Sequence, residues 1–457
     1  MTAQTITATE QGDRRTTELV LIVFALLLAV AAYAAVGLGH NDRVPASLLF
    51  YGAGLAVLVV AAHFAIRRYA PYADPVFLPL AAALNGLGLV LIHRLDLASS
   101  KHDNAPLQLV WTMFGVAVFI GVLVVVRDHR VLQRYTYTAG LLGLVLLALP
   151  ALIPARFSTV NGARIWIRVG GLSFQPGEAA KLALMVFFAG YLVAKRDVLA
   201  LASRRVAGID LPRGRDLGPV LLAWAASLLV LVVEKDLGTS LLFFGIFISM
   251  LYVATERRSW LLIGLGLFAA GAFFAYHTFG HVRDRVDIWL HPFNYAQGQG
   301  YQLVQAMYGM SFGRLFGSGL GQGRPDIVPY ANSDFIISTV GEELGLAGLM
   351  AVLMVFLLIV MRGIRAALAV RDSFGKLLAA GLAFAIGLQV FVVVGGVTRL
   401  IPLTGLTTPF LSYGGSSLLA EWAIIALLVR ISDAGRRPEA VPQTASPDDA
   451  LTQVVRR

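Results

Sequence analysis

Long apolar runs recur along this 457-residue chain, and most of them are long enough to cross a lipid bilayer. A spanning segment must satisfy its backbone hydrogen bonds internally, so runs of this kind form α-helices in a membrane. The composition agrees, because 57% of the residues are hydrophobic and only 14% are charged, which is typical of the membrane class. We therefore predict an all-α polytopic membrane protein with about twelve transmembrane helices, from the length that a bilayer requires. The predicted spans lie at 19–38, 46–66, 75–93, 107–126, 137–153, 178–194, 217–233, 238–254, 259–277, 341–361, 377–397 and 411–431.

Lys and Arg gather in alternate loops, which predicts the orientation of the chain. The dense basic loops at 195–215 and 362–376 belong to the set that also holds both chain ends. Basic loops stay in the cytoplasm, so both termini are predicted to be cytoplasmic. The opposite, extracytoplasmic face then carries the loops 154–177, 278–340 and 398–410. These loops and the lipid headgroups explain the net charge of +10 better than nucleic acid does.

The stretch from Gly395 to Ser417 cannot form one continuous helix, although it lies between two strongly apolar segments. Pro402 and Pro409 each remove a backbone donor, and five glycines in the stretch tolerate positive φ. Irregular backbone at membrane depth is tolerated only where it is buried in protein or lines a wet cavity. The alternative is a packing corner, in which small residues let helices approach closely.

Two groups of charges stand beside apolar spans. Glu178 and Lys181 are three residues apart on a helix that should start at Pro176, so they share one face. An ionisable pair at that depth is a functional candidate, and the alternative is a neutralising ion pair. The second group, 234–236, holds three consecutive charges between two spans, which an ordinary outer turn would also explain.

The large extracytoplasmic loop 278–340 contains a helical pattern of its own. Apolar residues recur at helical spacing between Leu303 and Phe316, and glycines follow them. This pattern predicts a re-entrant or interfacial helix that could admit a lipid from the side, and core packing is the competing explanation.

The run from Pro402 to Ser417, PLTGLTTPFLSYGGSS, resembles the C-terminal signature of the SEDS family, the bacterial shape, elongation, division and sporulation proteins. The resemblance covers about Asn161 to Ser432. It implies a polytopic glycosyltransferase that polymerises lipid II into peptidoglycan, with inversion and with undecaprenyl pyrophosphate as the leaving group. Family members commonly have about ten spans at the usual bilayer length, so this chain is expected to carry two extra spans at its N-terminal end.

The predicted organisation follows from the spans and the resemblance. We expect a disordered cytoplasmic N-terminus at 1–16, N-terminal transmembrane helices with the two extra spans at 17–153, and the SEDS catalytic core at 154–431. A disordered cytoplasmic tail should occupy 432–457. The long N-terminal part favours an elongation role over division or sporulation without deciding between them.

Several residues match family motifs, and their roles are implied by that resemblance. Gly-Ala-Arg164-Ile-Trp166 and Gln175-Pro-Gly-Glu178-Ala-Ala-Lys181 are similar to the family's Gly-Ala-x-x-Trp and Gln-Pro-Ser-Glu-x-x-Lys. The resemblance implies that Arg164 and Lys181 clamp the lipid pyrophosphate. Trp166 would contact sugar or lipid, and Glu178 would orient Lys181. Further substrate-binding candidates are Gln302, Asp334, Arg399 and Ser412.

The loop departs from the family pattern at the expected catalytic base. The family carries an aspartate in Asp-Pro-x-Gly-x-Gly-Tyr-Gln, and counting back along this sequence puts Tyr295 at that place. A phenol with an ordinary pKa of about 10 is a poor base at neutral pH. Asp287 and His291 could replace it if both lie on the last turn of one helix, although Pro292 disfavours helical geometry at His291. The other candidate bases are Asp236, within the family-like Asp-Leu-Gly-Thr, Asp334 and Glu342.

The implied partners are lipid II, the nascent glycan strand, membrane lipids and a class B penicillin-binding protein that acts as transpeptidase. A divalent cation such as Mg²⁺ or Mn²⁺ could help to neutralise the pyrophosphate, but the sequence contains no dedicated metal motif and no cysteine. Two alternatives remain open at this stage. One is a non-catalytic scaffold for the penicillin-binding protein, in which case Tyr295 explains the missing activity, and the other is a lipid II flippase.

Overall fold

Helices dominate the computed structural model, which describes residues 8–98, 103–160, 163–169, 172–200, 202–206, 209–212, 218–234 and 236–438. In this described part, ten helices are long and apolar enough to cross a membrane. The all-α polytopic prediction is confirmed. The ten helices are α1 (Ala8–Asn41), α2 (Leu48–Tyr69), α3 (Phe77–Ala98), α4 (Asn104–Val125), α8 (Pro176–Ala200), α10 (Leu237–Thr255), α11 (Arg258–Thr278), α15 (Gly345–Ala369), α16 (Ser373–Val397) and α17 (Gly415–Arg436).

Two further apolar helices occupy the remaining predicted spans. They are α6 (Thr136–Leu152) and α9 (Gly218–Glu234), and each has 17 residues, the lower end of the spanning length. The prediction of about twelve spans therefore places a helix correctly at every position. The other ten helices are longer.

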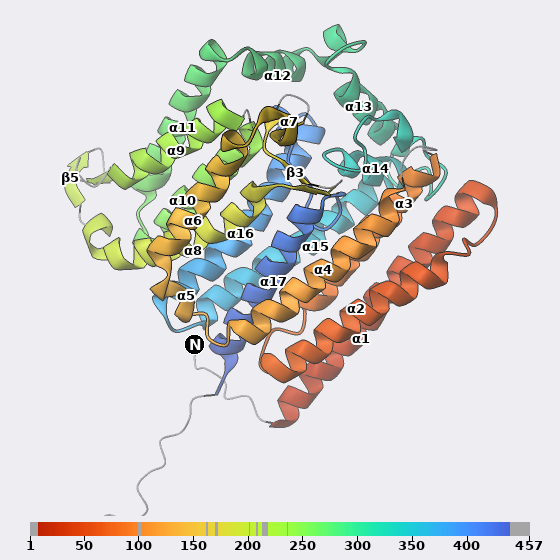
Figure 1. Cartoon of the computed structure of the whole chain (residues 1–457), viewed down its shortest axis with the longest axis horizontal. Coiled ribbons are helices and arrows are strands. Elements are labelled where there is room, and N and C mark those ends of the chain that lie inside the picture. Colours follow the sequence, from red (N-terminus) through yellow and green to blue (C-terminus); the bar gives the residue numbers. More distant parts are fainter. Residues whose placement is uncertain are drawn as a thin grey trace, which may run out of the picture.

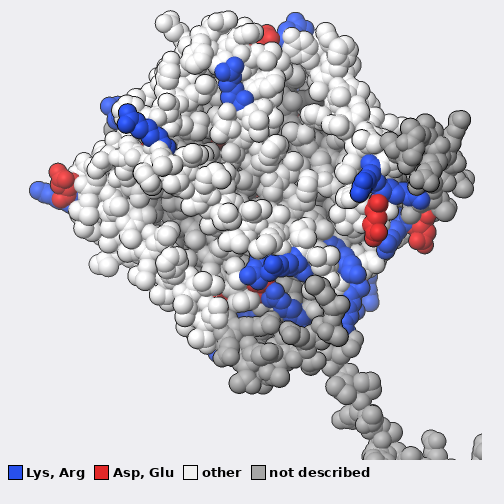
Figure 2. All heavy atoms as spheres, turned by 180° about the vertical axis from the view of Figure 1, so that it is seen from behind, with Lys and Arg blue, Asp and Glu red and all other residues white. Residues whose placement is uncertain are grey.

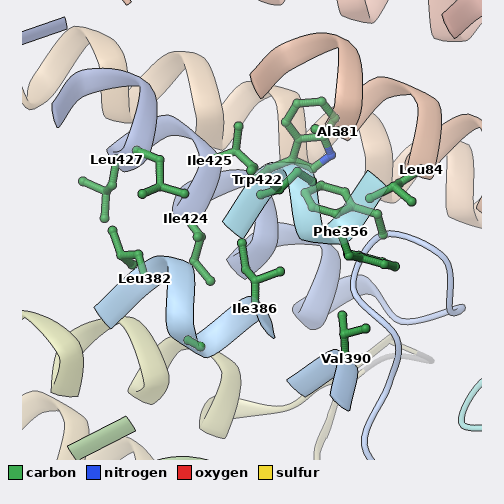
Figure 3. Close-up of a cluster of buried hydrophobic side chains, with 14 of the residues drawn as sticks. Ala81, Leu84, Phe356, Leu382, Ile386, Val390, Trp422, Ile424, Ile425 and Leu427 are labelled. Carbon is green, nitrogen blue, oxygen red and sulfur yellow. The ribbon is translucent and has the colours of Figure 1, made fainter. Parts of the chain in front are cut away.

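The C-terminal helix α17 lies at the centre of the bundle. In its most apolar stretch 94% of the residues are buried in protein, against 28% for α1, α11 and α15, which face the surroundings. Figure 3 shows part of the core, to which α17 contributes Trp422 and Ile425, α16 contributes Ile386 and α15 contributes Phe356. Viewed from behind, the surface shows a wide uncharged area with basic side chains gathered towards its edges, as a lipid-facing surface requires (Figure 2).

The strands are few and short. They form three antiparallel pairs in the described residues, β1 with β2, β3 with β4 and β5 with β6. The remaining short elements connect the long helices or build the outer loop. Their bounds are α5 (Val131–Arg134), α7 (Ala155–Ser158), β1 (Thr159–Val160), β2 (Ala163–Arg164), β3 (Ile167–Val169), β4 (Leu172–Phe174), β5 (Ala202–Val206), β6 (Ile209–Pro212), α12 (Gly280–Leu290), η2 (Pro292–Tyr295), α13 (Tyr301–Gly313), η3 (Pro325–Ile327) and α14 (Ile336–Glu343).

Helices extend into both segments that were predicted to be disordered, and polar residues there form ion pairs. Helix α1 begins at Ala8, and its Arg15 pairs with the buried Glu18. Helix α17 continues to Arg436, which pairs with Asp74. The boundaries at 16 and 432 are therefore wrong, and residues 1–7 and 439–457 lie outside the described residues.

The loop helix predicted between Leu303 and Phe316 is present as α13. Leu303 and Val304 are buried, whereas Phe312 is 77% and Phe316 is 81% exposed, so one face packs and the other does not. The Leu315 carbonyl accepts a hydrogen bond from the Ala347 N–H in the first turn of α15. The end of α13 therefore lies level with the start of a membrane span, which supports the interfacial interpretation.

The signature stretch is irregular, as predicted. No helix or strand covers the described residues 398–414, and Arg399, Gly405 and Phe410 have φ angles of 63°, 79° and 62°. Figure 1 shows α16 and α17 side by side in the middle of the bundle, with the α1–α2 hairpin at its edge. The signature therefore connects two central helices beneath the outer loop.

Candidate functional site

A polar cavity of about 510 Å³ lies between the outer loop, the signature stretch and the starts of α8 and α10. Five of the residues singled out in the sequence line it together: Trp166, Glu178, Asp236, Gln302 and Asp334. They come from five separate places in the chain, and the irregular signature backbone at Leu403 to Thr407 completes the wall. The expectation that this backbone lines a cavity is confirmed.

The buried Asp236, the half-buried Asp334 and one guanidinium, that of Arg285, are the charged groups that dominate the electrostatics of the cavity. Asp236 caps the N-terminus of α10 and accepts hydrogen bonds from the Thr239 N–H at 2.9 Å and the Thr239 hydroxyl at 2.6 Å. Asp334 accepts one hydrogen bond from the Ser333 hydroxyl at 2.7 Å. Arg285 of α12 donates to the Leu403 carbonyl at 2.9 Å. Both carboxylate oxygens of Asp236 thus accept a hydrogen bond from Thr239, whereas the Ser333 hydroxyl donates to only one oxygen of Asp334.

Burial shifts the protonation equilibria of this group. It raises the pKa of Asp236 and of Asp334, while the Arg285 charge and hydrogen bonds oppose the rise. Burial likewise lowers the pKa of Arg285, and both carboxylates oppose that change. Because an arginine stays protonated in proteins, the single positive charge of Arg285 favours the ionised form of both carboxylates. An aspartate in such a cavity can accept a proton at a pH nearer to neutral than an exposed aspartate can.

Arg285 was missed in the sequence. It lies three and four residues before Ile288 and Trp289, which also line the cavity, so one face of α12 points inward. That spacing is the signal that could have found it.

A second cavity, of about 450 Å³, has an almost wholly apolar lining from α9 to α12 and α16. Arg285, Leu403 and Thr404 line both cavities. A polar space and an apolar space therefore meet at a guanidinium, which suits a ligand with a hydrocarbon chain and an anionic headgroup.

Lys181 does not line either cavity, so the structure gives no support to a pyrophosphate clamp there. Its side chain is 2% exposed and is bonded to Glu178, Glu421 and Gln389, each at 2.9 Å. The implied pairing of Glu178 with Lys181 is confirmed by the first of these contacts. Glu421 was not identified from the sequence as a site residue. It is a single acidic residue within an apolar run, and that feature could have indicated it.

Three other substrate-binding candidates do not line the polar cavity, and two of them, Arg399 and Ser412, bind backbone carbonyls of the outer loop. Arg399 donates from Nε to the Trp289 carbonyl at 2.8 Å and from a terminal nitrogen to the Leu290 carbonyl at 2.9 Å. The Ser412 hydroxyl donates to the Ser333 carbonyl at 2.6 Å. Arg164 is half-buried on β2 and does not line either cavity.

The proposed Asp287–His291 dyad finds no support in the geometry. Helix α12 ends at Leu290, and His291 follows it with φ −130° and ψ 56°, as expected before Pro292. The hydrogen bond described between the two residues joins the His291 N–H to the Asp287 carbonyl at 2.8 Å, not their side chains. His291 is exposed, and Tyr295 in η2 is 41% exposed outside the polar cavity.

Glu342 is buried away from the polar cavity and accepts a hydrogen bond from the Arg324 N–H at 2.6 Å. Its neighbour Glu343 pairs with Arg94 of α3 at 2.7 Å. These two acids fasten the outer loop to the bundle, and Glu342 is thus a poor candidate for the base.

Taken together, the fold and the two adjacent cavities define a multi-pass membrane protein with a site that suits an amphipathic anionic ligand. Residues 75–437 match the FtsW, RodA and SpoVE family, described as cell cycle protein, and the chain belongs to this family. The SEDS resemblance is confirmed. Helices α1 and α2 precede the matched region.

Individual relatives extend this result. The chain is 52% identical over 451 residues to "Peptidoglycan glycosyltransferase RodA" of Mycobacterium tuberculosis, covering 97% of this chain and 96% of that protein. It is 34% identical to "Probable peptidoglycan glycosyltransferase FtsW" of Geobacter metallireducens, covering 80% of this chain and 95% of that protein.

Among solved structures, the rod shape determining protein RodA of Thermus thermophilus matches with a TM-score of 0.55 at 26% identity, covering 79% of this chain and 96% of that chain. A chain described for the structural coordination of polymerization and crosslinking by a peptidoglycan synthase complex matches with a TM-score of 0.54 at 27% identity, covering 84% of this chain and 96% of that chain.

Proposed function

We propose that this protein is a peptidoglycan glycosyltransferase that polymerises lipid II in the polar cavity. The observation that carries the proposal is Arg285, which lines both the polar and the apolar cavity and shares the polar cavity with the carboxylates of Asp236 and Asp334. The names of the mycobacterial and Geobacter relatives support the same activity. In this arrangement the apolar cavity takes the polyprenyl chain, Arg285 takes the pyrophosphate and the polar cavity takes the sugars.

The reaction needs a base for the acceptor and a cation for the leaving group. Asp334 takes the proton of the sugar 4-hydroxyl as the oxygen bonds to the anomeric carbon with inversion. The bond from that carbon to the pyrophosphate breaks, its electron pair leaves with the phosphate oxygen, and Arg285 stabilises the charge. Asp236 is the less suitable base, because Thr239 donates to both of its carboxylate oxygens.

The proposed reaction uses no divalent cation. Among the described residues, no group of three or more His, Asp or Glu side chains is arranged so that it could hold a metal ion. The donor set around Asp236 and Asp334 already serves Thr239, Ser333 and Arg285, which does not fit an ion held by the protein.

The proposed setting is the bacterial cell membrane with both termini in the cytoplasm, so that the polar cavity faces the cell wall. The proposed partner is a class B penicillin-binding protein, which crosslinks the strands. The similarity to a chain of a peptidoglycan synthase complex supports such a partner.

The direct test incubates the purified chain with labelled lipid II, alone and with its penicillin-binding protein, and separates the products on a gel. We expect glycan polymer from the wild type and at least a hundredfold less from Asp334→Asn, about the contribution of a general base. A wild-type protein that makes no polymer beside an active control would favour the scaffold. Movement of intact lipid II across vesicles without polymer would favour the flippase.

A further inference from the structure

Lys181 is enclosed by acceptors from three helices. Its ammonium is bonded to Glu178 of α8, Glu421 of α17 and Gln389 of α16, each at 2.9 Å. The ammonium donates hydrogen bonds to Glu421 and Gln389, and its ion pair with Glu178 completes this Lys181 cluster. Lys181 therefore binds a substrate phosphate only if it gives up contacts with these partners.

Glu421 depends on Lys181 more than Glu178 does. Glu421 is fully buried at 0% exposure, and among the described residues Lys181 is the one cation within ion-pair distance of it. Its second carboxylate oxygen has no hydrogen-bond partner in the described part of the chain. Glu178, in contrast, lines the polar cavity and can be solvated there. An unpaired charge in a membrane core is costly, so losing Lys181 would leave Glu421 uncompensated.

The cluster also reaches the wall of the polar cavity. The Gln389 side-chain amide donates to the Thr407 carbonyl of the signature stretch at 2.9 Å, and the Thr407 hydroxyl donates to Ser417 at 3.0 Å. Thr407 and Glu178 both line the cavity. Lys181 therefore connects two walls of the cavity through Glu178 on one side and Gln389 on the other.

We propose that Lys181 is a positioning residue for glycosyl transfer and not a pyrophosphate ligand, and that Glu421 is its required counter-ion. The kinetic part of this inference rests on the proposed function, whereas the pairing of Lys181 with Glu421 does not. The two parts therefore need separate measurements.

The test compares Lys181→Met, Glu421→Gln and the double variant in detergent, with Lys376→Met as control because Lys376 is exposed at the start of α16. Thermal unfolding measures the pairing. Lys181→Met should unfold several degrees below the wild type, since a buried charge loses its partner, and the double variant should recover most of that loss. The control should unfold like the wild type. A Lys181→Met protein as stable as the wild type, or a double variant no more stable than Lys181→Met, would overturn the pairing.

Polymerisation of lipid II by the same proteins measures the positioning role. Lys181→Met should lower kcat at least tenfold, and the double variant should return to within about tenfold of the wild type with an unchanged KM for lipid II. A stable double variant with no polymerisation, or with a strongly raised KM, would show that the lysine contacts the substrate. If the wild type makes no polymer, the proposed function fails, and the unfolding data still decide the pairing.

Discussion

Replacing Arg285 by methionine should nearly abolish polymerisation, because this side chain is the cation shared by both cavities. Methionine keeps much of the length and the apolar stem but removes the charge and the hydrogen bond to the Leu403 carbonyl. Lysine at the same place keeps the charge and loses the planar fork that recognises phosphate oxygens.

The magnitude follows from what Arg285 faces. A preorganised donor that meets developing negative charge contributes about 10² to 10³ in kcat, or about 3 to 4 kcal/mol. Its loss also leaves Asp236 and Asp334 without the positive charge that now opposes the rise of their pKa values. We therefore expect kcat to fall by about 10² to 10³ for methionine and by about tenfold for lysine. The acidic limb of the pH profile of the lysine variant should keep its position, because the charge is retained.

The assay is the initial rate of polymer formation from labelled lipid II across a range of concentrations, with thermal unfolding as the folding control. A folded Arg285→Met protein that keeps its rate within about threefold of the wild type would refute the reasoning, since that change is below 1 kcal/mol.

Further expectations follow from the same geometry. Burial raises the pKa of Asp334, and a base works only when it is deprotonated. The polymerisation rate should therefore fall with decreasing pH, with a midpoint above the ordinary aspartate pKa of about 4. A rate that stays constant down to that pH would contradict this role. His291→Ala should change the rate by less than about twofold, because this exposed side chain lies outside the polar cavity, and a large loss would restore the dyad. Gly39→Ala should lower stability by about 1 to 3 kcal/mol, because its Cβ would lie 2.2 Å from the Leu320 carbonyl oxygen of the outer loop. Gly121→Ala has nothing within 4 Å of the new Cβ and is the matched control, so equal unfolding of the two variants would refute this contact.

The positions of the helices could be predicted because lipid leaves the backbone few alternatives. The helix ends could not, because their extension depends on ion pairs such as Arg436 with Asp74, which are 362 residues apart. The predicted spans at 137–153 and 217–233 match α6 and α9 in length and are displaced by one residue.

The site was predictable only in part for a similar reason. Family-like motifs identified Asp236 and Asp334, but Arg285 became significant only when folding placed it in the same cavity as both aspartates. Lys181 matched a family motif, yet its role changed because Glu421, 240 residues further along the chain, occupies it. Pairings over such separations leave no periodic trace in a single sequence.

The most direct test of the account is to place a photoreactive phenylalanine analogue at Tyr330 or at Tyr295 and irradiate the protein with labelled lipid II. Both side chains are well exposed, at 57% and 41%, but Tyr330 lines the polar cavity and Tyr295 does not. The account predicts lipid II crosslinked to position 330 and little at position 295. Crosslinking at position 295 with none at position 330 would contradict it.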